Sequence, residues 1–164
     1  MHCSSRATLC TASLAFLASC VSSPIPEGYT GSTATIRDSA RPESGSRAIF
    51  FYVAKIDGNA IKDSLAVTRQ VNYGRGASLT PKVIERKVPA RPLVLTLEGR
   101  TAYGAPIQEI FNTKTMYRVD AIVEFAPAPD RVYVVMGILQ QDRTEIWLAD
   151  DATGERVGKV VQPK

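Results

Sequence analysis

Apolar and polar residues alternate along most of the chain after its first 47 residues, and this period of two predicts β-strands. The pattern is clearest over 117–125, where charged residues such as Arg118 and Glu124 separate apolar residues that would share one buried face. Two runs, 49–54 and 132–139, are apolar on both faces, which predicts strands inside a sheet. The pattern predicts strands over 49–54, 82–88, 93–98, 117–125, 132–139, 144–148 and 157–161.

Turn-forming residues separate the predicted strands at a steady spacing. Asp57-Gly58 ends the first strand, and Pro127 ends the strand over 117–125. Residues 60–72 show helical spacing and fit either a short helix or an irregular crossover, so we expect at most one short helix. Several short strands and so little helix predict an all-β domain over residues 47–164, an antiparallel sandwich or barrel.

The first 19 residues differ from the rest of the chain. They contain one basic residue, Arg6, and no acidic residue, and an apolar stretch runs from Leu9 to Ala18. As a helix this stretch would be ~15 Å long, which is too short for a bilayer core of about 30 Å. A basic start, a short apolar middle and small residues at the end are the parts of a secretory signal peptide.

The apolar stretch ends in Leu17-Ala18-Ser19-Cys20, which resembles the lipobox of bacterial lipoproteins. The resemblance implies that residues 1–19 are a signal peptide that is removed just before Cys20. It also implies diacylglycerol on the Cys20 thiol and an acyl chain such as palmitate on the new amino group, which together give a stable membrane anchor. Because residue 21 is Val and not Asp, it further implies an outer-membrane lipoprotein that faces the periplasm of a Gram-negative bacterium.

Removal of the signal peptide would also remove Cys3, Cys10 and the only histidine, His2. The mature chain would then keep Cys20 alone, with lipid on its sulfur, and would form no disulfide. Without histidine or a free thiol, it would have neither a Ser-His-Asp nor a Cys-His mechanism. A zinc site would have to consist of carboxylates alone. We therefore expect no enzyme activity, no metal and no cofactor.

Residues 20–46 follow the predicted lipid attachment and are rich in Ser, Pro, Gly and Thr, with few large apolar residues. Such a segment buries too little apolar surface to offset its ordering entropy. We expect a flexible tether over 20–46 that lets the domain stand off the membrane.

Charged residues are well mixed along the chain, with 20 Lys and Arg against 16 Asp and Glu and a net charge of +4. A mixed pattern of this kind is typical of a solvated surface and predicts no nucleic-acid partner.

Three short motifs resemble an acid–base pair, an anion site and a calcium loop, and each is better explained as an ordinary loop. Adjacent residues such as Asp150-Asp151 point to opposite faces of a strand, so they converge as an acid–base pair only in a bent loop. No helix is expected after Gly74-Arg75-Gly76 to complete an anion site. A calcium loop that starts at Asp57 would need oxygen ligands where Ile61 and Thr68 stand.

Two places are candidates for binding another molecule. Trp147, the single tryptophan, lies opposite Ile146 and Leu148 in the pleat, so it is either a surface anchor or part of a second core face. Tyr73 and Arg75 lie in a glycine-rich loop. The predicted site residues are therefore Cys20 for lipidation and, for binding, Tyr73, Arg75 and Trp147.

Three short strings in the body resemble small envelope lipoproteins: Ile56-Asp57-Gly58, Val88-Pro89-Ala90, and the hairpin loop from Asp150 to Gly154. The resemblance implies an immunoglobulin-like or carboxypeptidase-regulatory-like sandwich and no activity. We expect an antiparallel immunoglobulin-like β-sandwich on a lipid anchor. Its expected role is binding or structural support in an envelope assembly, with another envelope protein as partner; this role rests on analogy, because sandwiches host many functions.

Two other functions stay open. The first is a periplasmic inhibitor or immunity protein against a wall- or lipid-degrading enzyme, which would use a protruding loop at Asn72–Ser78 or Gln140–Arg143. The second is a hydrolase that uses carboxylates alone, which would need two of them facing each other across a deep cleft.

Overall fold

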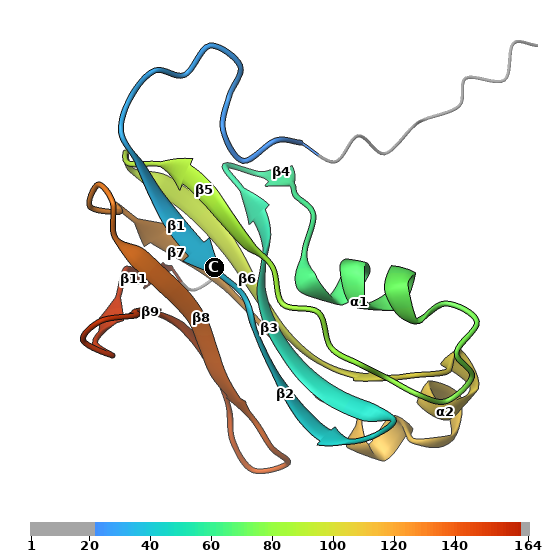
Figure 1. Ribbon diagram of the computed structural model, residues 1–164. Helices are drawn as coiled ribbons and strands as arrows, with labels where there is room; N and C mark the ends of the chain where they lie inside the picture. Colours follow the sequence, from blue (N-terminus) through green and yellow to red (C-terminus); the bar gives the residue numbers. More distant parts are fainter. Residues whose placement is uncertain (1–21, 162–164) are drawn as a thin grey trace, which may run out of the picture.

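The alternating segments form two β-sheets that pack face to face, with a helix on the outer side of one of them (Figure 1). The computed structural model describes residues 22–161. The five-stranded sheet has the order β10 (Arg156–Val157), β9 (Thr144–Asp150), β8 (Val132–Leu139), β1 (Thr33–Arg37), β5 (Glu85–Pro89). The six-stranded sheet has the order β11 (Lys159–Val161), β7 (Arg118–Phe125), β6 (Leu93–Tyr103), β3 (Arg47–Ile56), β2 (Ser39–Ser44), and β4 (Asn59–Ala60) also pairs with β3.

Helical segments connect some of these strands: α1 (Ser64–Asn72), α2 (Pro106–Phe111) and the 3-10 turn η1 (Thr113–Thr115). The mostly-β character predicted from the sequence is confirmed. α1 matches the helix expected within 60–72, whereas α2 goes beyond the single helix that the sequence predicts. The pairing of β1 with β8 is parallel, so the prediction of a purely antiparallel arrangement is wrong at this pair.

Residues 33–44 form β1 and β2, so the prediction of a flexible tether over 20–46 is wrong for this part, and the folded domain begins before residue 47. Ala34 and Ile36 on β1 are buried. β1 also pairs with β5 on one side and with β8 on the other. Burial and pairing together stabilise this strand, although the surrounding sequence has few apolar residues. The predicted signal peptide over 1–19 and Cys20 lie outside the described residues.

At two places a single residue separates a strand of one sheet from a strand of the other. β1 belongs to the five-stranded sheet and β2 to the six-stranded sheet, with Asp38 between them. Near the end of the chain, β10 and β11 make the same change of sheet at Gly158. Gly158 has a φ of +81°, and a side chain there would approach Val123 to 2.6 Å, so glycine is required for the crossing.

Phe51 of β3 lies in the core between the sheets and contacts both of them. A Cβ at Gly99 of β6 would come within 2.9 Å of the Phe51 ring, and one at Gly137 of β8 would overlap that ring. The two glycines therefore leave the space that the ring fills. Large buried residues on both sheets, such as Leu97 and Leu148, belong to the same core.

The other face of β3 is buried as well, because α1 covers it (Figure 1). Phe50 and Tyr52 on this face pack against Leu65 of α1 and Leu79 of the segment that follows the helix. The two-sided apolar run predicted over 49–54 is thus explained by sheet packing on one face and helix packing on the other.

Candidate binding surface

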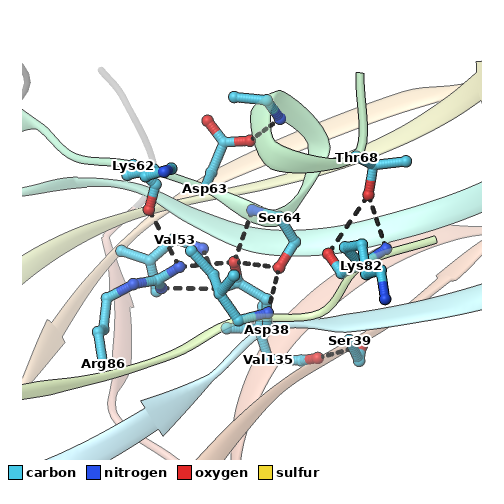
Figure 2. Close-up of polar contacts among 12 residues, drawn as sticks. Asp38, Ser39, Val53, Lys62, Asp63, Ser64, Thr68, Lys82, Arg86 and Val135 are labelled. Atoms are coloured by element: carbon cyan, nitrogen blue, oxygen red, sulfur yellow. Dashed lines mark hydrogen bonds and ion pairs between the residues drawn. The ribbon is translucent and has the colours of Figure 1, made fainter. Parts of the chain in front are cut away.

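A buried ion pair between Asp38 and Arg86 joins the sheet crossover to β5 (Figure 2). The guanidinium donates from Nη1 to Oδ1 at 2.7 Å and from Nη2 to Oδ2 at 2.6 Å. This bidentate geometry is the strongest that arginine and a carboxylate form. Both side chains are almost fully shielded from solvent.

Asp38 also accepts hydrogen bonds from β3 and α1. The backbone N–H of Val53 donates to Oδ1 at 3.1 Å, and the N–H and hydroxyl of Ser64 donate to Oδ2 at 3.0 and 2.8 Å. The Ser64 hydroxyl oxygen accepts from the N–H of Ile84 at 2.9 Å. Protein donors thus occupy the acceptor positions of this carboxylate, and we assign the network a structural role: it fixes where α1 begins.

Asp63 is the N-cap of α1, and its carboxylate accepts a hydrogen bond from the N–H of Ala66 at 2.8 Å. Partial burial raises the pKa of Asp63 above its usual value. The hydrogen bond from Ala66 opposes this shift, and the negative charge of Asp38 adds to it. The helix start therefore contains a carboxylate that is harder to ionise than in water.

Two buried polar residues, Thr68 and Asn72, fix the other end of α1. The Thr68 hydroxyl accepts from the N–H of Lys82 at 2.8 Å. The Asn72 side chain donates to the carbonyl oxygen of Thr80 and accepts from its N–H, both at 2.9 Å. These bonds hold the segment before β5 against the helix, so the loop after Asn72 leaves α1 in a fixed direction.

A groove of about 700 Å³ opens between the end of α1 and the start of α2. Apolar residues and glycines form most of its lining, among them Tyr73, Leu79 and Tyr103. Arg69 of α1 and Glu109 of α2 also line it and form an ion pair of 3.1 Å that links the two helices.

Gly104, just before α2, brings the loop after α1 into close contact with the end of β6. A Cβ at Gly104 would collide with the carbonyl oxygen of Ala77 and would approach that of Ser78 to 2.7 Å. The absence of a side chain at this position therefore sets how closely the two walls of the groove approach each other.

Four large apolar side chains at this groove and on α2 are exposed to solvent: Tyr73 at 92%, Phe111 at 80%, Ile110 at 66% and Ile107 at 55%. The three on α2 share one helix face, because they are spaced i, i+3 and i+4. We call these four residues and the groove the α2 surface. Apolar side chains gathered in this way are typical of interaction sites.

Local sequence explains why α2 forms without burying any of its residues. Pro106 is at the first helical position, where its fixed φ is favourable. The Gln108 side chain accepts from the N–H of Ala105 at 3.1 Å, and the Asn112 side chain donates to the carbonyl oxygen of Gln108 at 2.7 Å. The apolar face of the helix is therefore not used in packing the described chain.

The structure separates the residues that the sequence predicts for binding. Tyr73 and Arg75 are both exposed and lie on the loop beside the groove. Trp147 lies on β9 in the five-stranded sheet, is half-buried, and carries the Arg156 guanidinium 3.8 Å from its ring centroid. Arg143 and Arg156 also lower the pKa of Glu145 beside it through hydrogen bonds. Trp147 is therefore not part of the α2 surface.

Asp150 and Asp151 do not form a pair. Asp150 is buried, and its side chain accepts hydrogen bonds from the N–H groups of Ala152 and Thr153 at 2.9 and 3.2 Å. Asp151 forms an ion pair with Arg37 of β1 instead. Both carboxylates hold the hairpin loop in place, as the loop interpretation predicts.

A second hollow, of about 410 Å³, lies near the turn between β3 and β4 and is lined in part by Asp57 and Phe125. Asp57 accepts from the N–H of Val94 at 2.9 Å and from Arg91 at 2.8 Å, so its carboxylate stabilises the turn. Within residues 22–161, no group of three or more His, Cys, Asp or Glu residues is arranged to hold a metal ion. In the same range, no helix is long and apolar enough to cross a membrane.

The sequence pattern does not single out Ile107, Ile110 and Phe111. Their helical spacing directly after Pro106 is a usable signal, but α2 has only six residues, and so short a stretch carries little periodicity. The pattern also does not reveal the pairing of Asp38 with Arg86, because 48 residues separate them in the chain.

In comparisons with known proteins, the chain matches no protein-family model, no curated protein and no solved structure.

Proposed function

We propose that this chain is a lipid-anchored envelope protein whose domain binds another envelope protein through the α2 surface. The observation that carries the binding role is the exposed apolar face of α2, the helix whose Pro106 and Glu109 line an open groove; Phe111 on that face is 80% exposed and Tyr73 in the groove is 92% exposed. Exposed aromatic side chains beside a pocket are typical anchors of protein interfaces.

The anchor part of the proposal rests on the sequence. Leu17-Ala18-Ser19-Cys20 follows a short apolar stretch and supports lipidation at Cys20, with Val21 favouring the periplasmic face of the outer membrane. We also propose that the two sheets form an immunoglobulin-like sandwich. This fold would identify no activity by itself.

Binding is favoured over catalysis by the contents of the groove. It contains a single carboxylate, Glu109, which is paired with Arg69, so no second carboxylate faces it as general acid–base work would need. The buried pair of Asp38 and Arg86 lines neither hollow.

An inhibitor or immunity role is the second candidate. The loop Asn72–Ser78 supports it, because Tyr73 and Arg75 in that loop are exposed and would enter a cleft of a target enzyme together. This role would use the same surface and differs from an assembly role only in the identity of the partner.

The anchor is tested by the Cys20→Ala variant in the host cell, with radiolabelled palmitate and membrane fractionation as readouts. We expect the variant to lose acyl labelling and membrane association. Cys10→Ala is the matched control, because it changes a cysteine of the predicted signal peptide and should leave both unchanged. Labelled, membrane-bound Cys20→Ala protein would contradict the proposal.

A further inference from the structure

The α2 surface combines apolar contacts with positive charge. Segments 69–82 and 103–116, which include most residues of this surface, contain four cationic side chains against one carboxylate. The only carboxylate, Glu109, is already paired with Arg69. Arg75 and Lys114 are exposed and make no ion pair within the described chain, so their charges are available to a partner.

The α2 surface lies at the opposite end of β3 from the start of the described chain (Figure 1). The N–H of Ser22 donates to the carbonyl oxygen of Ala60 at 3.0 Å, next to the last residues of β3. α2 follows Tyr103, which pairs with Arg47 at the first residue of β3. A strand of this length separates the two ends by roughly 30 Å.

This separation disfavours the anchoring membrane as the occupant of the surface. One residue, Val21, lies between Cys20 and Ser22, and the two residue steps that join them span only about 7 Å in an extended chain. While Ser22 keeps its hydrogen bond to Ala60, a lipid on Cys20 would therefore hold the β4 end of the domain near the bilayer and leave the α2 surface at the far end. A second copy is disfavoured too, because two such surfaces would bring like charges together.

We propose that the groove of the α2 surface receives an acidic, amphipathic segment of another protein. The segment would pass around α2: some of its apolar side chains would fill the groove beside Tyr73, and others would pack on Phe111, which lies outside the groove on another face of the helix. Its carboxylates would meet Arg75 and Lys114. Such a segment fits a known mode of peptide recognition, in which an amphipathic segment places its apolar face in a groove. This inference rests on the proposed binding role and specifies the chemistry of the partner.

The test uses the chain as the cell makes it, purified in non-ionic detergent, and a library of random 12-residue peptides displayed on phage. We expect the selected peptides to combine aromatic or aliphatic residues with a net negative charge. The best peptide, made synthetically, should bind about 30-fold more weakly to Phe111→Ser, the loss expected for an aromatic hot spot. Met136→Ser is the matched control, because Met136 is exposed on β8 of the other sheet.

A charge exchange tests the electrostatic part. Arg75→Glu should weaken binding of the acidic peptide, and a peptide with lysines in place of its carboxylates should bind that variant better than it binds the wild type. Selection of basic or uncharged peptides, or equal binding to Phe111→Ser and wild type, would overturn the inference. So would a dimer in sedimentation that Phe111→Ser abolishes. Flotation with phosphatidylglycerol vesicles is measured on a chain that begins at Ser22 and so carries no lipid, and flotation that Phe111→Ser abolishes would also overturn the inference. Failure of the anchor proposal is separate, because it appears only in acyl labelling of Cys20.

Discussion

Asp38 and Arg86 form a bidentate, solvent-shielded ion pair at the point where the chain crosses from one sheet to the other. The pair connects β5 to the crossover, and the hydrogen bonds of Asp38 to Val53 and Ser64 extend it to β3 and α1. Because α1 carries the loop of Tyr73 at its far end, this pair supports the α2 surface from a distance.

Replacing Arg86 with Met should leave Asp38 buried without its cation. We expect the free energy of unfolding to fall by about 3–5 kcal/mol, the usual cost of breaking a buried pair on one side. Urea unfolding followed by Trp147 fluorescence measures it. Arg91→Met, which breaks the exposed pair with Asp57, should cost no more than about 1 kcal/mol. Equal losses in the two variants would show that the buried network is not the stabilising feature.

Asp63→Asn tests the raised pKa of the α1 cap. The pKa of Asp63 is higher in the folded state than in the unfolded state, so the folded state binds this proton more tightly. The free energy of unfolding of the wild type therefore falls as the pH rises through the folded-state pKa. Asn caps a helix as well as Asp does and does not ionise. The stability of Asp63→Asn relative to wild type should therefore increase as the pH rises from about 3 to about 6. Urea titrations across this range measure the difference, and an opposite slope contradicts the shift.

Gly104→Ala tests the close contact between the walls of the groove. The added Cβ would collide with backbone atoms of Ala77 and Ser78. Backbone atoms cannot move aside as easily as the end of a flexible side chain can. We expect a loss of about 1–3 kcal/mol in unfolding free energy. Gly45→Ala is the control, because a Cβ there meets nothing within 4 Å, and thermal melts compare the two variants. A Gly104→Ala protein as stable as Gly45→Ala would rule out the contact.

The strands of the domain could largely be predicted because their alternation is local. Residues 93–98 and 117–125 show it plainly, and both lie in strands of the six-stranded sheet. The sequence pattern does not reveal β1, because its five residues lie in a segment rich in Ser, Thr and Gly. Its pairing partners, β5 and β8, lie about 50 and 100 residues away in the chain. The buried face of α1 is mostly polar, with Ser64, Thr68 and Asn72, so hydrophobic periodicity indicates the helix only weakly.

The α2 surface could be predicted only in part, because only some of its features are local in the sequence. Tyr73 and Arg75 attract notice because glycines surround them, and the structure places both beside the groove. The groove itself requires contact between Gly104 and a loop more than 20 residues earlier, which no local pattern reveals.

Phe111→Ser should leave the fold unchanged. Its ring is 80% exposed, so we expect a change in unfolding free energy within about 0.5 kcal/mol, as for other surface substitutions. Phe51→Ala, in the core, should cost about 3–5 kcal/mol in the same urea titration. A large fall in the unfolding free energy of Phe111→Ser would mean that this ring stabilises the domain itself and is not a free contact for a partner.

Photo-cross-linking in living cells is the most direct test of whether the α2 surface binds an envelope protein. A photoreactive amino acid is placed at Phe111 or, as control, at the exposed Met136 of the other sheet. We expect one discrete cross-linked protein from position 111. It should be absent from position 136 and should be lost when Ile110 is also changed to Ser. Identical products from both positions, or none from position 111, would contradict binding by the α2 surface.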